Sequence, residues 1–354
     1  MEKTVRYLCH MVPLENYFLG GERNFDFGES DRSGKSDYYI ESEYNPSQPT
    51  LFGMLRFLVL KKAGRLNNAP GALLDGDQIE FIGRKGFSIE NCFELKNYGK
   101  LKKLEPLFIT NEDGSWLVPV PLNHKKGAEN YMPFSMAAAF RTDIGETTIL
   151  PADYNAKDGL ESGYLNLETQ KIVPEKDIYY SAVHTRIAKT KDEDAFFKMK
   201  YRGLKNGYRF SFICETEGDV LPHDEIVYIG QGKSAFHFTA EETNIKCVSE
   251  NIKTMQLGAP EGYSVYYALS DAYLENEISS DFSVVKKKLI RTLGTTGKNG
   301  YRDSMKKSRL FYLVSAGSVF YVKDTVKFET GIKCDGAQQI GMNCFVKTEA
   351  KNEK

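Results

Sequence analysis

Several residue types that would support metal, disulfide or membrane chemistry are scarce in this sequence. Its 354 residues include five histidines, six cysteines and one tryptophan. No two cysteines form a CxxC pair, so they predict reduced thiols in a cytoplasmic protein rather than a disulfide framework. No Cys/His cluster has the spacing of a zinc site, and we expect neither a metal nor another cofactor.

Neither charge sign is in excess, and long apolar runs are missing. Lys and Arg together number 47 against 48 Asp and Glu, a net charge of -1. A polyanionic partner would therefore need locally clustered basic residues. The longest apolar run, residues 51–60, contains Arg56 and is too short to span a bilayer. Because the N-terminus also lacks the regions of a signal peptide, we expect no membrane partner.

Two short motifs suggest enzymes but lack parts that the chemistry needs. His223-Asp224 is an HD dipeptide, yet the further His and Asp spacing of a metal phosphohydrolase is not evident, and a solvated turn is the plainer interpretation. Residues 294–298 contain a Gly-Lys pair, as a phosphate loop does. Their glycines are too close together, and Asn299 stands where that loop requires Ser or Thr.

What the sequence does contain is an ordinary globular composition with many aromatic residues. Hydrophobic residues make up 41% and charged residues 27%, and a length of 354 residues suggests about two domains. The 21 tyrosines and 22 phenylalanines favour strands and are suited to stacking on unpaired bases.

Alternating residues and turn signals predict a strand-rich chain. The predicted strands are residues 5–14, 78–82, 86–93, 107–109, 115–120, 177–187, 195–201, 208–215, 225–228, 235–238, 263–269, 309–314 and 318–322. Hairpins are expected within 78–93, 107–120, 195–215 and 225–238. Residues 281–293 are predicted to be helical. Residues 121–175 are predicted to be irregular, which places a domain boundary or an insertion there.

The stretch from Pro46 to Arg56 (PSQPTLFGMLR) predicts the helix around which the chain is organised. Thr50 can cap its first turn, the prolines keep the preceding chain extended, and Gly64 ends the helix. Gly53 has two interpretations. It can lie at a packing contact of a buried amphipathic helix, or it can let a ligand approach the backbone closely.

Further fragments combine glycines with basic or aromatic residues. They are residues 183–187 (VHTRI) followed by 194–197 (DAFF), 228–234 (YIGQGKS), 316–321 (AGSVFY) and 338–343 (QQIGMN). Glycines allow successive backbone N–H groups to point at a phosphate, while Arg and Lys neutralise phosphates and aromatic rings stack on bases. These residue types would suit contacts with single-stranded RNA.

In their order and spacing, the helix and these fragments resemble the RAMP proteins of CRISPR systems, over nearly the whole chain. The resemblance is to the subunit that caps the 5′ end of the guide RNA in type III-B (Cmr) effector complexes, with the related type III-A subunit next. It implies an α+β fold of tandem ferredoxin-like (RRM-like) domains with Gly-rich loops and insertions, over residues 1–175 and 176–354. One departure is Gln338-Gln339, where family members often carry more glycine.

This resemblance implies a non-catalytic subunit that holds the 5′ repeat-derived tag of the guide RNA in antiviral defence. Its partners would be the guide RNA, the large signalling and interference subunit and the backbone RAMP subunits, with target RNA contacted indirectly. No catalytic residue is implied. The residues implied to bind RNA are Arg23, Arg32, Lys35, Ser47, Gln48, Thr50, Gly53, Arg56, His184, Arg186, Gly230, Gln231, Gly232, Lys233, Lys298, Gln339, Gly341 and Asn343.

Basic residues are concentrated in residues 283–309, where Asp303 is the only acid. They are Lys286, Lys287, Lys288, Arg291, Lys298, Arg302, Lys306, Lys307 and Arg309. The segment is either a solvated face or an RNA contact. The preceding stretch, residues 270–282, is acidic and is predicted to face a basic protein neighbour rather than RNA.

Two other functions remain open at this point. Some RAMP relatives cleave guide precursors with a histidine, and His10 or His184 could take that role. The plainer interpretation of each histidine is a strand residue or an RNA contact. An unrelated β-rich interaction module is the second alternative. Copurification separates these, since a subunit should bring RNA and partner proteins, whereas a nuclease should turn over a hairpin precursor alone.

Overall fold

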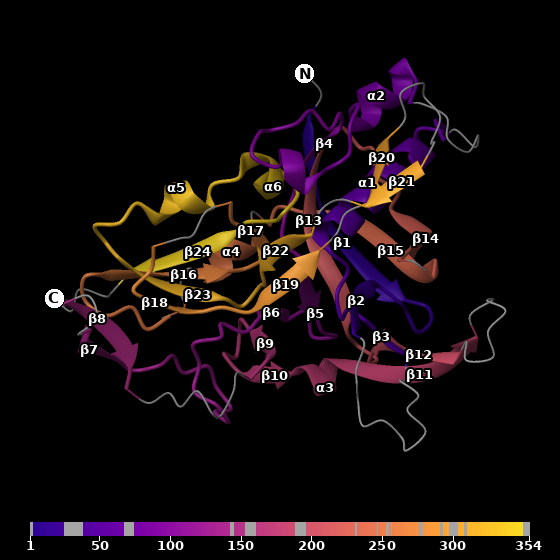
Figure 1. Cartoon of the computed structure of the whole chain (residues 1–354). Coiled ribbons are helices and arrows are strands. Elements are labelled where there is room, and N and C mark those ends of the chain that lie inside the picture. Colours follow the sequence, from indigo (N-terminus) through magenta and orange to yellow (C-terminus); the bar gives the residue numbers. More distant parts are fainter. Residues whose placement is uncertain are drawn as a thin grey trace.

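The chain folds into an α+β structure in which strands predominate over short helices (Figure 1). The computed structural model describes residues 3–24, 38–66, 74–141, 145–152, 161–187, 196–230, 232–245, 247–252, 255, 257–275, 279–290, 293–296, 304–307 and 310–349, and every structural statement below concerns these residues. No helix among them combines the length and the apolar composition needed to cross a bilayer.

A large, mainly antiparallel sheet forms the centre of the molecule. Its strands run in the order β10-β9-β6-β5-β13-β1-β15-β14, and β4 also pairs with β13. Their bounds are β1 (Thr4–Pro13), β4 (Leu101–Leu104), β5 (Phe108–Thr110), β6 (Trp116–Pro119), β9 (Gly163–Asn166), β10 (Ile172–Pro174), β13 (Arg209–Glu217), β14 (Asp224–Ile229) and β15 (Ser234–Glu242). The predicted hairpins 107–120 and 225–238 are confirmed, as β5–β6 and β14–β15.

Helix α1 (Gln48–Lys62) packs on one face of this sheet. Alternate residues of β1, such as Cys9 and Met11, point at the apolar side of α1, where Leu55 and Leu58 are fully buried. Burying each such leucine contributes roughly 1.5–3 kcal/mol. The helix ends at Gly64, which adopts the left-handed conformation expected of a helix-terminating glycine.

A smaller C-terminal sheet packs against the opposite face of the central sheet. Leu8 of β1 and Ile213 of β13 contact this second core, which also contains Val265 and Tyr321. The sheet has the order β18-β23-β16-β24. Its strands are β16 (Tyr263–Ala268), β18 (Phe282–Val284), β23 (Val319–Lys323) and β24 (Phe345–Glu349), and beside it β17 (Ala272–Tyr273), β22 (Phe311–Val314) and β19 (Lys287–Ile290) form another sheet.

The remaining elements extend from these two layers. A sheet of order β11-β12-β3-β2 projects from the lower right in Figure 1. Its strands are β2 (Gly20–Asn24), β3 (Tyr38–Ser42), β11 (Tyr179–Ile187) and β12 (Phe196–Leu204). Two strand pairs are β7 (Met136–Arg141) with β8 (Glu146–Pro151) and β20 (Leu293–Thr296) with β21 (Ser304–Lys307). The other helices are α2 (Gly76–Ile82), a 3₁₀ turn (Ile89–Asn91), α3 (Glu175–Ile178), α4 (Val248–Ile252), α5 (Phe328–Ile332) and α6 (Asp335–Gln339).

Several sequence predictions are wrong, each for a local reason. Residues 78–82 form helix α2 because Asp75 and Gln78 make a capping box that satisfies the first-turn N–H groups. The residues of 281–293 that are described fall in strands β18, β19 and β20, which pair with or lie beside other strands rather than coiling. Residues 121–175 contain strands β7 to β10 instead of being irregular.

The predicted hairpin within residues 195–215 is also wrong. Strand β12 pairs with β11 and β3, whereas β13 pairs with β1, β4 and β5. The Gly207 turn between β12 and β13 therefore carries the chain from the projecting sheet into the central one. The boundary predicted between residues 175 and 176 passes through the central sheet, because strands from both sides of it are hydrogen-bonded neighbours.

The C-terminal glycine motif joins the end of the chain to the start of α1. Gly341 has a φ of +79°, and a Cβ there would lie 2.1 Å from Nε2 of Gln48 and 2.8 Å from the backbone of Glu105. That amide donates to the carbonyl oxygens of Glu105 and Ile340, at 2.9 and 3.1 Å. The buried Asn343 bonds to both backbone groups of Tyr273. The motif thus acts as an internal joint.

Two glycines allow a stability test with opposite expected signs. Gly53→Ala should raise the free energy of unfolding by up to about 1 kcal/mol, because a Cβ there meets nothing within 4 Å and alanine is the better helix former. Gly341→Ala should lower it by at least about 2 kcal/mol through left-handed strain and collision with Gln48. Urea unfolding of both variants measures this, and equal effects would contradict the assigned environments.

Acid should destabilise the fold through His10, which lies buried in the central sheet. Its Nδ1 is 2.8 Å from Oγ of Ser211. Burial, aided by the charge of Arg209, lowers the pKa of His10 to about 4. Because the unfolded chain binds this proton near pH 6.5, stability should fall as the pH drops from about 6.5 towards 4, by at most about 3 kcal/mol. Unfolding of His10→Gln across this range should show a smaller pH dependence, with the exposed His184→Gln as control.

Candidate nucleic-acid interface

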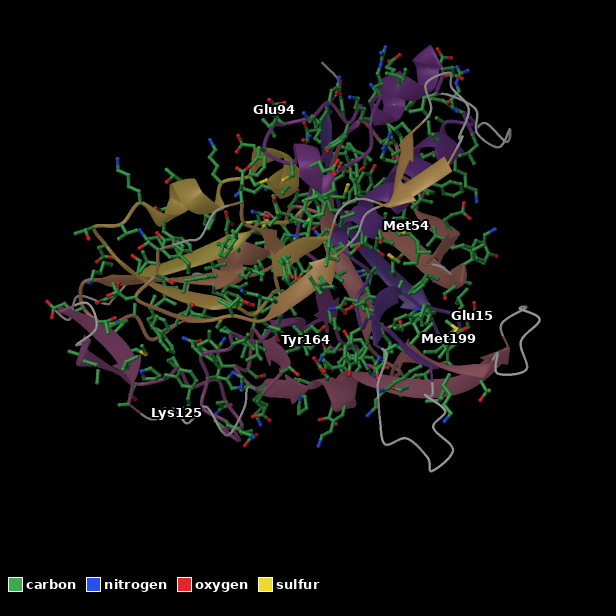
Figure 2. The ribbon with its side chains drawn as sticks, in the orientation of Figure 1. Glu15, Met54, Glu94, Lys125, Tyr164 and Met199 are labelled. Atoms are coloured by element: carbon green, nitrogen blue, oxygen red, sulfur yellow. The ribbon has the colours of Figure 1, made fainter. Side chains whose placement is uncertain are left out.

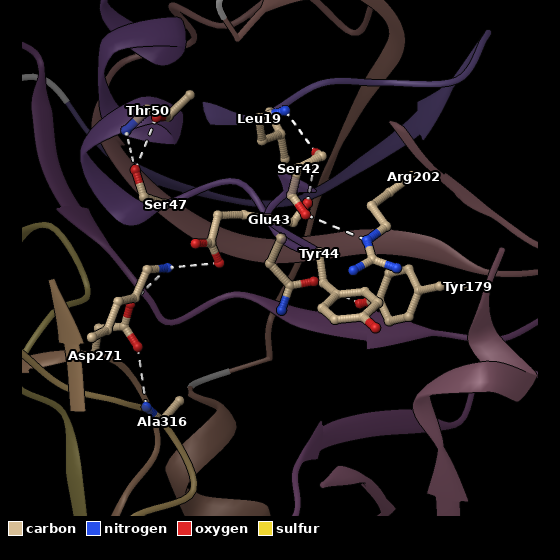
Figure 3. A network of polar contacts seen from close by, with 12 residues as sticks. Leu19, Ser42, Glu43, Tyr44, Ser47, Thr50, Tyr179, Arg202, Asp271 and Ala316 are labelled. Carbon is tan, nitrogen blue, oxygen red and sulfur yellow. Dashed lines mark hydrogen bonds and ion pairs between the residues drawn. The ribbon is translucent and has the colours of Figure 1, made fainter. Parts of the chain in front are cut away.

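A cleft of about 430 Å³ lies where the first turn of α1 meets the C-terminal part of the chain. One wall is formed by residues 41–49, which run from the end of β3 into α1. The facing wall comes from residues 269–271, 286–288 and 315–316. Figure 3 shows the polar contacts that cross between these walls.

Ser47, not Thr50, caps helix α1 at the edge of the cleft. Its Oγ accepts from the backbone N–H of Thr50 at 3.4 Å and lies 2.9 Å from Oγ1 of Thr50 (Figure 3). The residue preceding the first helical residue is the one that can reach this N–H, so the cap falls three residues earlier than predicted. Ser47, Gln48 and Pro49 all line the cleft, at the positive end of the helix dipole.

Lys288 connects the two walls. Its Nζ lies 3.2 Å from the carboxylate of Glu43 and 3.7 Å from that of Asp271. Burial disfavours its charged form, but the two carboxylates outweigh this effect, so the pKa of Lys288 lies above its ordinary value. Asp271 also accepts from the N–H of Ala316 at 3.1 Å (Figure 3). The geometry of the cleft therefore depends on charge pairing across it.

A second buried cation, Arg202 of β12, holds the strand that leads into the cleft. Its guanidinium donates to the carboxylate of Glu41 at 3.0 Å and to the carbonyl oxygen of Ser42 at 3.4 Å. The guanidinium lies 3.9 Å from the centre of the Tyr44 ring (Figure 3). Stacking and a charge-assisted hydrogen bond together fix this arginine, so it shapes the cleft wall rather than offering a free charge.

Lys286 and Lys287 differ from these two cations. Both line the cleft, and within the described part of the chain neither makes an ion pair with a carboxylate. The cleft lining balances its four cations with the carboxylates of Glu41, Glu43, Glu175 and Asp271. What it offers an anion is therefore two ammonium groups without an ion-pair partner beside a helix N-terminus, and not a net positive charge. Within the basic segment predicted from the sequence, these two lysines are therefore the described side chains best placed to meet a phosphate.

The Gly230–Lys233 turn lies between β14 and β15 and is linked to the cleft through residues 18 and 19. Gly230 has a φ of +79°, and a Cβ on it would be 2.4 Å from the carbonyl oxygen of Phe18. The next residue, Leu19, donates its N–H to Oγ of Ser42, which lines the cleft. Lys233 is exposed and has a φ of +53°. The predicted turn is present, with Gly232 unobstructed and Gln231 outside the described residues.

The other predicted RNA contacts are dispersed. His184 is exposed on β11 and packs edge-on against the ring of Tyr201, 4.9 Å away. Arg23 and Arg186 lie in strands β2 and β11, but their side chains are not described. The predicted residues that lie outside the described part of the chain are Arg32, Lys35 and Lys298.

Three predicted contacts have partners within the chain. Arg56 donates to the carbonyl oxygen of Gly83 at 3.2 Å, and burial lowers its pKa from the ordinary value. Gln339 bonds to both backbone groups of Lys96. Asn343 is fully buried. The side-chain Nε2 of Gln48 also donates to backbone carbonyl oxygens, whereas its Oε1 has no partner among the described residues. Of these four residues, only Gln48 lines the cleft.

A hydrolytic site in this chain would draw on a metal-binding group of residues or on the HD dipeptide. No group of three or more His, Cys, Asp or Glu among them could hold a metal ion. His223 of the HD dipeptide lies 3.1 Å from the carbonyl oxygen of Ala240, while Asp224 contacts His237 at 2.8 Å. The two residues of that dipeptide thus have separate partners.

Sequence reasoning misses Tyr44 and Arg202, whose importance depends on contacts between distant strands. It identifies Lys286 and Lys287 as basic but does not place them among the named RNA contacts. One signal could have identified them. They lie in the basic segment, and no acidic residue occurs in the sequence between Asp281 and Asp303.

The fold can be compared with solved structures. A chain in the "Cryo-EM structure of the Type III-B Cmr-beta bound to cognate target RNA and AMPPnP, state 1" is 13% identical, with a TM-score of 0.49 over 96% of this chain and 95% of that chain. A chain in the "Crystal structure of Csm1-Csm4 cassette in complex with AMPPNP" is 13% identical, with a TM-score of 0.35 over 91% and 88%. No curated protein matches the sequence.

A protein-family model matches most of the chain. It is described as CRISPR-associated protein (Cas_Cmr3), and the match covers residues 9–329. This range includes the second half of β1, the whole of α1, the Gly230–Lys233 turn and the basic strand β19. The chain therefore belongs to the CRISPR-associated Cas_Cmr3 family, as a subunit of a type III-B (Cmr) effector complex.

Proposed function

We propose that this subunit holds the 5′ repeat-derived tag of the guide RNA without cleaving it, and links it to the large signalling subunit. The observation that carries the proposal is the cleft beside the N-terminus of α1, where Lys286 and Lys287 have no carboxylate partner in the described structure. A single-stranded nucleotide fits the chemistry of such a site, because the lysines meet phosphate and Tyr44 and the polar wall meet base and ribose.

The division of charges inside the cleft supports this function. Arg202 and Lys288 are neutralised by Glu41, Glu43 and Asp271, so they hold the walls together whether or not RNA is present. The two remaining lysines, Lys286 and Lys287, would attract the phosphate backbone of the guide RNA. The subunit would thus fix the register of the guide by shape and phosphate contacts, with few base contacts.

The proposal includes finer expectations about the assembly. The proposal keeps two ferredoxin-like modules. The module that contains β1 and α1 would take strands β13 and β15 from beyond residue 175, because β1 pairs with both. The protein partners would be the large signalling and interference subunit and the backbone RAMP subunits, and target RNA would be met only through the guide. The complex would act in the cytoplasm. An unrelated interaction module is no longer an alternative, given the family.

A salt titration tests the RNA contact. The double variant Lys286→Ala/Lys287→Ala should weaken guide binding. It should also make the slope of log affinity against log salt shallower by about 1.4, because each phosphate of a single strand that is no longer neutralised accounts for about 0.7. Lys205→Ala/Lys327→Ala removes the same charge from exposed positions outside the cleft and should leave the slope unchanged. An unchanged slope in the first variant would refute the proposed site.

Arg56→Ala separates a structural role from the RNA role expected by resemblance. Its contact with the Gly83 carbonyl predicts a lower melting temperature with unchanged guide affinity and salt slope. A shallower slope with an unaltered melting temperature would instead place Arg56 on the RNA.

A second measurement addresses catalysis. The isolated protein should not cleave a hairpin guide precursor, with or without a divalent metal, because His10 is buried and uncharged at neutral pH and His184 contacts only an aromatic ring in the described structure. Gel analysis of labelled precursor measures turnover. Steady cleavage that disappears in His184→Ala would establish the processing endoribonuclease instead.

A further inference from the structure

Within the described part of the chain, one corner of the central sheet is covered on only one side. The C-terminal layer packs over Leu8 and Ile213, but further along β1 the same face carries the exposed Val12. Strand registers place Val12, His237 and Ile226 opposite one another on three adjacent strands. Side chains that are opposite in an antiparallel sheet project from the same face, so these three form one row.

A second row lies directly beside the first. Leu14 donates its N–H to the carbonyl oxygen of Ala235, and Ala235 is opposite Tyr228. Leu14 and Tyr228 are 55% and 66% exposed, and Ile226 is 47% exposed. Val12, Leu14, Ile226 and Tyr228, here called the β14 patch, therefore form an apolar surface in which His237 separates Val12 from Ile226. Scattered exposed apolar residues are normal, but a patch of them on a sheet face marks an interaction site.

At the edge of strand β14, one outward backbone group already has a partner within the chain. The outward N–H of Ile226 donates to the carboxylate of its own neighbour Glu225 at 3.0 Å. That carboxylate is held in turn by Lys61 of α1 at 2.7 Å. Blocking of an edge N–H by a charged side chain disfavours strand pairing. An occupant should therefore lie on the face of the β14 patch rather than extend the sheet.

The charges nearest the patch argue for a protein rather than RNA. Asp224 lies two residues from Ile226 on the same face, and its side chain is 73% exposed. Glu15 follows Leu14, and its carboxylate accepts from the N–H of Ala235 at 3.2 Å (Glu15 is labelled in Figure 2). Carboxylates at both ends repel a phosphate backbone and attract lysine or arginine. The positive Lys233 lies beyond the end of the strands, on the turn.

From this arrangement we propose that the β14 patch is the docking surface for a neighbouring protein subunit of the effector complex. The contact surface of that subunit would be apolar at its centre and would carry lysine or arginine opposite Glu15 and Asp224. Tyr228 would be the central anchor, since a largely exposed tyrosine offers a large amphipathic surface for burial. The inference rests on family membership and not on the guide-holding role. The results for Lys286 and Lys287 therefore neither support nor contradict it.

Photo-crosslinking in the purified, guide-loaded complex tests the occupant directly. Benzoylphenylalanine replaces Tyr228 in one complex and Tyr312, an equally exposed tyrosine on β22, in a control complex. A crosslink from position 228 to one protein subunit of the complex, absent from position 312, supports the proposal. A crosslink to RNA, a crosslink to a second copy of this chain, or no specific crosslink would overturn it.

Substitutions test the chemistry of the contact. Ile226→Ser/Tyr228→Ser should reduce retention of that subunit on the order of tenfold or more, while Tyr312→Ser should not. Asp224→Lys should also weaken retention, most strongly at low salt. Circular dichroism and guide affinity of the isolated protein should be unchanged in all three. Retention equal to wild type in the double variant, or a loss of guide affinity in its place, would contradict the proposal.

Discussion

The functional geometry of this protein depends on one half-buried ammonium group. Lys288 belongs to the C-terminal part of the chain, yet it is neutralised by Glu43 from the strand-to-helix segment and by Asp271 from its own side. A buried charge is costly unless it is paired. Removing either carboxylate would leave Lys288 poorly compensated, so the two walls are held at a defined separation. The cleft is a consequence of this pairing.

The same principle divides the cations of the cleft into two kinds. Arg202 and Lys288 are engaged by the chain and define shape, whereas Lys286 and Lys287 are adjacent in sequence to Lys288 but lack such partners in the described structure. Strand alternation separates Lys287 from Lys288, because successive side chains of an extended segment point in different directions, and Lys286 lies just before β19. Composition alone could not distinguish them, since all are basic residues in one run.

Local signals predict the parts of the fold that local chemistry controls. Helix α1, strand β1 and the turn at Gly230 follow from apolar periodicity and glycine positions within a few residues, and the structure has all three. The pair Asp75 and Gln78 is an equally local signal for a helix. The apolar segment that follows is so short, however, that its pattern fits a strand as well. The resemblance to the family comes from the order of such motifs rather than from any one.

What the sequence could not predict depends on long-range pairing. Strand β12 joins β11 and β3 rather than its successor, whereas β13 pairs with residues 4–11 of β1, from the other end of the sequence. For the same reason the sequence does not reveal that Asn343 and Gln339, predicted to contact RNA, also bond within the fold to Tyr273 and Lys96. Gly341 is needed because of the amide of Gln48, which lies 293 positions away.

The long separation between paired strands also affects how the chain is made. Strand β1 is synthesised first, yet both of its neighbours, β13 and β15, lie about two hundred residues later and β15 ends at Glu242. At a translation rate of 5–20 residues per second, β1 emerges roughly ten to fifty seconds before its last partner. Throughout that interval both edges of an apolar strand are unpaired, a state prone to aggregation. The nascent chain therefore has more need of chaperone protection than a chain of the same size built from local hairpins.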